Sequence, residues 1–111
     1  MTRIARVIKK HFLYNMDKIK SGTTRIAEER TKQITKHGYT AEHDNAYKSH
    51  QLLFAAIAYL KAAIYDKSVG EDDWPFDKKY FKAGTDFVGD LATAGAFIAA
   101  EIDRLNLDEQ H

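Results

Sequence analysis

The chain has no cysteine, a single proline and no long apolar run, and each of these features excludes some classes of protein or structure. Without cysteine it forms neither disulfides nor thiolate metal sites, which favours a reducing compartment such as the cytosol. With Pro75 as the only proline, helices can extend over nearly all of the chain. No stretch is apolar over the roughly 20 residues that a membrane span requires. We therefore expect a helical, cytoplasmic protein that does not cross a membrane.

The first 20 residues are basic, with six Lys and Arg against Asp17, although the net charge of the whole chain is only +1. Apolar residues recur at helical spacing over 3–20, which predicts an amphipathic helix with a basic outer face. Polar residues at 9–11 interrupt the apolar run, so it does not match a signal peptide. Because the chain is nearly neutral and lacks interleaved aromatic residues here, we do not expect nucleic-acid binding.

Three further helices are expected, over residues 24–37, 46–65 and 86–105. Thr23 or Thr24 can cap the first of them, and Gly38 is placed to end it. The helix over 46–65 is apolar around most of its circumference, which favours a central position or a subunit interface. The last helix presents one apolar stripe, formed by Phe87, Leu91, Ala94, Ile98, Ile102 and Leu105.

The connections between these helices are polar. In 39–45, Thr40 or Asp44 can cap the next helix, and 66–73 is expected to be a loop. At 111 residues the chain is long enough for one hydrophobic core and too short for two. The sequence therefore predicts an all-α fold: a single domain over 1–111 that forms a compact bundle of about four helices and packs into a homo-oligomer.

The helix over 24–37 carries polar residues on its apolar face, where Arg30 and Gln33 accompany two isoleucines. A buried arginine needs an anionic partner, which is either internal, such as Glu101 or Asp86, or a phosphate of a ligand. Trp74 either stacks on a base or packs as part of a lid on the core. The candidate ligand-binding residues are Arg30, Gln33, His37, His43, Asp44, Trp74 and Lys82.

A second set of residues has the chemistry of a metal site. Under a hydrolase hypothesis Mg²⁺ would be held by Glu28, Glu29, Asp44 and Glu101. Their spacing matches no metal motif, and adjacent glutamates near a helix start also have a plain electrostatic explanation.

Residues 24–105 resemble a family of short proteins encoded by tailed phages and prophages. The resemblance rests on an ER-x-x-QI run at 29–34, on G-x-T-x-EHD at 38–44, and on the later Trp74 and Pro75. The chain departs from the pattern at Asn45, where relatives often have aspartate, and at 85–89, where they are richer in arginine. The resemblance implies an accessory phage protein acting in the host cytoplasm, a class that often counters host defence or adjusts nucleotide pools.

Three functions are compatible with these residues. The first is a homo-oligomeric binder of a nucleotide-like small molecule that works without catalysis or cofactor and sequesters a host defence signal. The second is a magnesium-dependent nucleotide pyrophosphohydrolase resembling the MazG-like enzymes, although one acid of their usual pairing is missing here. The third is a helical protein-interaction module that inhibits a host protein.

Overall fold

The computed structural model describes residues 19–38, 40–45 and 50–110. All regular structure in these ranges is helical, so the all-α prediction is confirmed. The predicted helix over 3–20 lies outside the described residues, apart from its last two positions. The elements are α2 (Gly22–His37), α3 (Ala41–Asp44), α4 (Gln51–Ile64), α5 (Lys67–Glu71), the 3₁₀ helix η1 (Lys78–Tyr80) and α6 (Phe87–Gln110).

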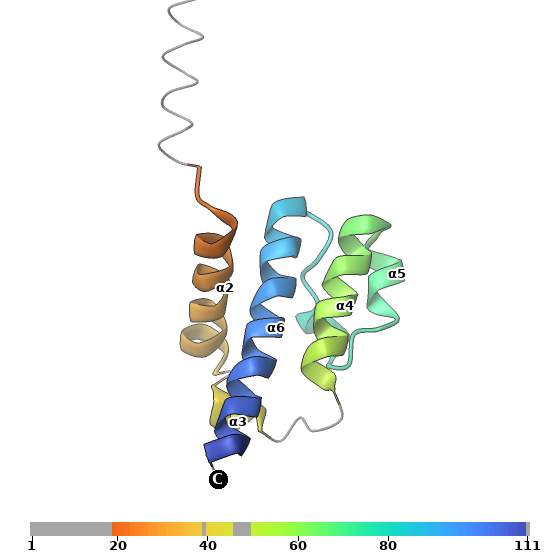
Figure 1. Cartoon of the computed structure of the whole chain (residues 1–111). Helices are drawn as coiled ribbons and strands as arrows, with labels where there is room; N and C mark the ends of the chain where they lie inside the picture. Colours follow the sequence, from red (N-terminus) through yellow and green to blue (C-terminus); the bar gives the residue numbers. More distant parts are fainter. Residues whose placement is uncertain (1–18, 39, 46–49, 111) are drawn as a thin grey trace, which may run out of the picture.

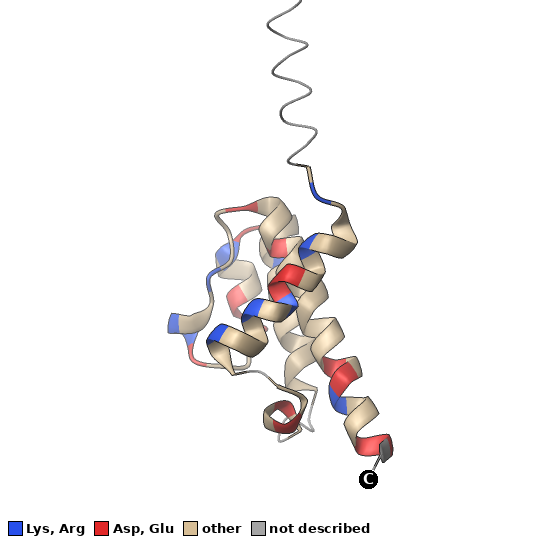
Figure 2. Ribbon diagram, turned by 90° about the vertical axis from the view of Figure 1, so that its left-hand side faces the viewer, with Lys and Arg blue, Asp and Glu red and all other residues tan. Residues whose placement is uncertain are grey.

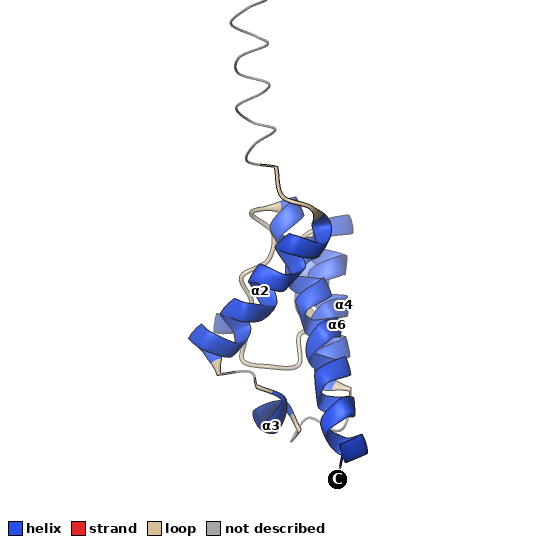
Figure 3. Cartoon of the chain, turned by 60° about the vertical axis from the view of Figure 1, so that its left-hand side comes forward, coloured by secondary structure: helices blue, strands red, loops and turns tan. Residues whose placement is uncertain are grey.

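Helix α6 is the centre of the arrangement. It packs between α2 and α4, and α3 lies against its C-terminal half (Figures 1 and 3). The short α5 packs on α4, on the side away from α6 (Figure 1). The segment between α5 and α6 therefore has to return across the bundle, and it carries the aromatic residues with it. None of the described helices is long and apolar enough to cross a membrane.

The ends of α2 follow local capping chemistry. Its N-cap is Ser21, whose Oγ accepts a hydrogen bond from the Thr24 amide at 3.1 Å, so the expected cap at Thr23 or Thr24 is wrong by two or three residues. Gly38 ends the helix with φ of 71°, a conformation that glycine adopts without steric cost, as predicted.

Two of the connections contain helices that the sequence did not indicate. Thr40 caps the single turn of α3, and its Oγ1 accepts from the His43 amide at 3.2 Å, whereas Asp44 ends that turn and is buried rather than capping. The expected loop over 66–73 contains α5, which Asp66 caps. Short helices of this kind are fixed by one capping side chain and by packing, neither of which gives a periodic pattern.

Glycine sets how closely two pairs of helices approach. A Cβ at Gly70 would lie 2.3 Å from the Ala58 carbonyl oxygen, so α5 packs directly on the backbone of α4. A Cβ at Gly95 would lie 2.7 Å from the Ile26 Cδ1, where α2 crosses α6.

The core combines a few large side chains with many alanines. Its large members are Leu52, Tyr59, Trp74, Phe81 and Phe97. The expected apolar stripe of α6 lies mainly on the outside: apart from Ala94, its members are between 40% and 61% exposed. Amphipathic helices usually turn such a stripe to the core. Here the Ala-rich face of α6 packs inward instead.

Candidate functional site

A cavity of about 300 Å³ lies between α2, α6, the centre of α4 and the segment before α6. Four of the seven predicted ligand-binding residues line it, namely Gln33, His37, Trp74 and Lys82. The α2 residues that line it lie three, four and eight positions after Glu29, so they share one face of that helix. Among the described residues, the cavity is lined by Glu29, Lys32, Gln33, His37, Tyr59, Trp74, Tyr80, Lys82, Thr85, Asp86, Gly89, Asp90, Thr93 and Phe97.

The inner wall of the cavity is aromatic. The rings of Tyr59 and Trp74 meet edge to face with centroids 5.7 Å apart, and those of Trp74 and Phe97 do so at 5.9 Å. The Trp74 indole donates to the Asp77 carbonyl at 2.9 Å, which fixes the orientation of its ring. Trp74 and Phe81 are core residues, as the lid interpretation expects, while Tyr80 is more than half exposed at the cavity.

Gln33 places an unpaired amide in this wall. Only 5% of the residue is exposed, and its Oε1 accepts from Arg30 at 3.4 Å, but its Nε2 has no hydrogen-bond partner among the residues that the structure describes. A buried donor without a partner costs about 1–3 kcal/mol. The Nε2 has almost no accessible surface in this conformation, so the side chain would have to rotate to present it to a hydrogen-bond acceptor in the cavity.

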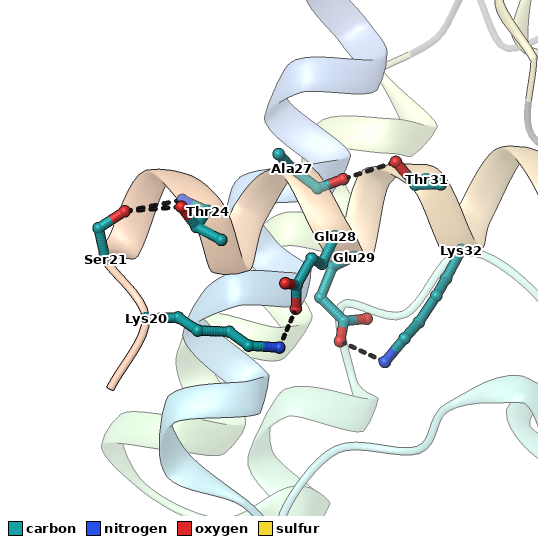
Figure 4. A network of polar contacts seen from close by, with 8 residues as sticks. All are labelled: Lys20, Ser21, Thr24, Ala27, Glu28, Glu29, Thr31 and Lys32. Carbon is teal, nitrogen blue, oxygen red and sulfur yellow. Dashed lines mark hydrogen bonds and ion pairs between the residues drawn. The ribbon is translucent and has the colours of Figure 1, made fainter. Parts of the chain in front are cut away.

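Charges of both signs surround the opening. Glu29 and Lys32 form an ion pair at 3.1 Å (Figure 4), and acidic and basic residues are interspersed along α2 (Figure 2). Asp90 is buried and accepts from the Gly84 amide at 2.9 Å. The Lys82 amide donates to the Tyr59 hydroxyl at 3.2 Å, which fixes the backbone of Lys82 at the cavity. Three carboxylates, two ammonium groups and one imidazole thus line the site.

Arg30 lies outside the cavity and has an internal partner. Its Nε is 3.0 Å from Asp103 Oδ2, so an internal carboxylate supplies an anionic partner for this buried guanidinium. Neither suggested partner is the right one, because Asp103 takes that place and Glu101 pairs with Arg104. Arg30 and Asp103 border a separate shallow depression between α2, α3 and α6.

His43 and Asp44 also lie away from the cavity, on α3. Asp44 is fully buried, and its Oδ1 is 3.1 Å from His43 Nδ1, while its Oδ2 has no partner. Burial raises the pKa of Asp44, and the hydrogen bond from His43 and the charge of Arg30 oppose that rise. The predicted ligand set therefore divides in two: one group lines the cavity, and Arg30, His43 and Asp44 lie elsewhere.

The four proposed magnesium ligands do not come together. Glu28 pairs with Lys20 at 3.0 Å and Glu29 with Lys32 (Figure 4), while Glu101 is buried against Arg104. Asp44 lies on α3. Within the described ranges, no three acidic or histidine side chains are placed to hold a metal ion.

Sequence reasoning missed part of the lining. Lys32 could have been found, since it precedes Gln33 and pairs with Glu29 three residues earlier. Tyr59 comes from a helix that is apolar on several sides, and Phe97 lies outside the expected apolar stripe of α6, so the pattern does not show that these two rings face a cavity. Comparisons with protein-family models, with curated proteins and with solved structures find no match. The resemblance to short phage proteins therefore stays a prediction from the sequence.

Proposed function

We propose that the protein binds one small nucleotide-like ligand in the cavity beside α2 and releases it chemically unchanged. The observation that carries the proposal is the buried Gln33 Nε2, which has no partner among the described residues, in the wall of a cavity lined by aromatic rings. Ligand sites typically combine an apolar wall with a few polar groups that fix the orientation of the ligand.

A nucleobase matches the inner part of the site. Its flat apolar faces suit a wall made of Tyr59, Trp74 and Phe97, and a carbonyl or ring nitrogen on its edge would accept the free Gln33 Nε2–H. Accessible aromatic rings stack on bases regardless of sequence, and Tyr80 offers such a ring. The volume of about 300 Å³ lies at the lower end of the usual range for ligand sites, which favours a single nucleoside unit.

The charged groups of the lining suit a phosphate of low charge. Lys32, His37 and Lys82 can donate to phosphate oxygens. Glu29, Asp86 and Asp90 carry three negative charges, which equal or exceed the positive charge of these three groups. We therefore expect nucleosides and nucleoside monophosphates to bind more tightly than triphosphates.

The positions of the acidic residues favour binding without turnover over pyrophosphate hydrolysis. Hydrolysis of a pyrophosphate bond is assisted by carboxylates that converge on magnesium and orient a water. Of the four candidate acids, Glu29 alone lines the cavity, and it is paired with Lys32.

The biological setting of the proposal comes from the resemblance of residues 24–105 to short phage proteins. We propose an accessory phage protein that acts in the host cytoplasm and sequesters a nucleotide-like defence signal. Sequestration requires tight, stoichiometric binding and recovery of the ligand intact.

A thermal-shift screen of the full chain tests the proposal, with nucleosides and mono-, di-, tri- and cyclic nucleotides, each with and without magnesium. A ligand that binds only the folded state raises the melting temperature in proportion to the logarithm of its concentration. We expect a shift that does not need magnesium, with the ligand recovered unchanged by mass spectrometry. The absence of a shift across the panel would refute a nucleotide-like ligand.

Gln33→Leu tests the residue on which the proposal rests. Gln33→Leu removes the unpaired Nε2 and also the 3.4 Å hydrogen bond that the Oε1 accepts from Arg30. These two effects oppose each other, so the stability of the free protein should change by less than about 1 kcal/mol, while the ligand shift should be abolished. Thr35→Ala is the matched control, because Thr35 is exposed on the same helix and does not line the cavity. A full ligand shift in Gln33→Leu would contradict the assignment.

A further inference from the structure

The large aliphatic side chains of α6 are on the outside of the molecule, and its small ones are inside. Nine of the fourteen buried hydrophobic residues in the described ranges are alanines. We use the name α6 seam for the exposed apolar residues of this helix: Phe87 (61% exposed), Val88 (45%), Leu91 (40%), Ile98 (44%), Ile102 (54%) and Leu105 (47%). A monomer that packs alanines inside and leaves such a row in water does not gain the free energy of burying its large apolar side chains.

The spacing of the α6 seam matches what a second helix requires. From Val88 onward its members follow one another by three, seven, four and three residues, which is the alternation of three and four found where two helices pack along their length. The position skipped in the step of seven is Gly95, and α2 covers it through Ile26. The seam extends over about 27 Å of helix axis.

We propose that the α6 seam joins two copies of this chain in a symmetric homodimer. In a two-fold dimer the same patch is used by both copies, so it must be complementary to itself. An uncharged row with a regular repeat meets that condition, because no like charges are brought together when the row packs on its own copy.

The exposed apolar area is sufficient for a stable dimer. Taking roughly 150 Å² for a fully accessible large apolar side chain, the seam leaves on the order of 400 Å² in water. Helix α4 lies beside α6 (Figure 1) and adds Phe54, Ile57 and Ile64, which are 44%, 37% and 67% exposed. Together they expose on the order of 600 Å² per copy, about 1,200 Å² in a dimer, the lower end of the range for specific interfaces.

The proposal is separate from ligand binding, since no residue of the α6 seam lines the cavity. Sedimentation equilibrium of the full chain over a wide concentration range tests it directly. We expect a species of twice the chain mass of 12.7 kDa. A monomer at every concentration would overturn the proposal and would assign the seam to another occupant, such as residues 1–18 or a host protein.

Ile98→Glu locates the interface. In the dimer it places a carboxylate of each copy in an apolar contact, so the dissociation constant should rise at least about 100-fold. The side chain is exposed in one copy, so the circular dichroism spectrum should not change. Val69→Glu is the matched control, because Val69 is also a partly exposed apolar residue but lies on α5. A dimer that tolerates Ile98→Glu but dissociates on Val69→Glu would place the interface elsewhere.

The absence of cysteine from the chain allows a second test that does not depend on weakening the dimer. Leu91→Cys, Ile98→Cys and Leu105→Cys are made singly and oxidised. If the two α6 helices run parallel, all three variants form disulfide-linked dimers, because each position meets its own copy. If they run antiparallel, the variant nearest the two-fold axis crosslinks preferentially. Crosslinking of none of the three, or of Val69→Cys to the same extent, would overturn the proposal.

Discussion

Replacing Gly70 by alanine should destabilise the protein strongly, although alanine is the better helix former. The added Cβ would lie 2.3 Å from the Ala58 carbonyl oxygen and 2.9 Å from the Ala62 amide nitrogen. Both are backbone atoms of α4, so no side-chain rotation can relieve the contact. An ordinary separation of carbon from carbonyl oxygen is about 3.3–3.6 Å, so α5 has to move by roughly 1 Å.

The expected cost follows from these contacts. Overpacking costs about 1–3 kcal/mol, and the upper half applies here because the backbone of α4 cannot yield easily. The higher helix propensity of alanine returns up to about 1 kcal/mol, which leaves a net loss of about 2 kcal/mol. For a domain of this size such a loss lowers the melting temperature by roughly 8–15 °C.

Thermal unfolding followed by far-ultraviolet circular dichroism measures the effect. Gly22→Ala is the control, because no atom lies within 4 Å of the Cβ that it adds, and its melting temperature should stay the same or rise slightly. If Gly70→Ala melted at the wild-type temperature, the close approach of α5 to α4 would be wrong.

Three further substitutions test other parts of the fold. Phe81→Ala should cost about 3–5 kcal/mol in urea unfolding because the residue is 1% exposed, whereas Tyr80→Ala, its exposed neighbour, should stay within about 0.5 kcal/mol; equal losses would contradict the burial of Phe81. Gly38→Ala should cost about 1 kcal/mol because φ is 71° there, and an unchanged midpoint would argue against that backbone conformation. Burial raises the pKa of Asp44, so the folded state holds this proton more tightly than the unfolded chain. Its contribution to stability therefore falls as the pH rises from about 4 through the raised pKa. The variant Asp44→Asn should not show that fall. Its unfolding free energy minus that of the wild type should therefore become more positive as the pH rises across this range. A difference that does not change with pH would refute the raised pKa of Asp44.

The all-α class and the end of α2 at Gly38 could be predicted because they depend on local chemistry and on helical periodicity. The orientation of α6 could not. Its large residues and its alanines form opposite faces, and the sequence does not show which of the two faces packs inward. A pattern of hydrophobicity identifies an apolar face, but packing of neighbouring helices decides what that face meets.

The candidate site was predictable to the extent that one helix forms it. Gln33 and His37 were found because both lie on one face of α2, and they do line the cavity. Arg30 has the same spacing, yet it turns to Asp103 across the α2–α6 contact. The partner of a long charged side chain is a residue distant in the chain, and only the three-dimensional arrangement identifies it.

At the crossing of α2 over α6, Gly95 affects the width of the cavity although it does not line it. Residues of both helices form the cavity, and the separation of those helices is set where Ile26 rests on the glycine. A larger residue at 95 would act as a spacer that tilts α2 away from α6 and widens the cavity. If the protein binds a ligand as proposed, a substitution at this helix crossing would change the size of the ligand that the cavity accepts, with every residue of the lining left as it was.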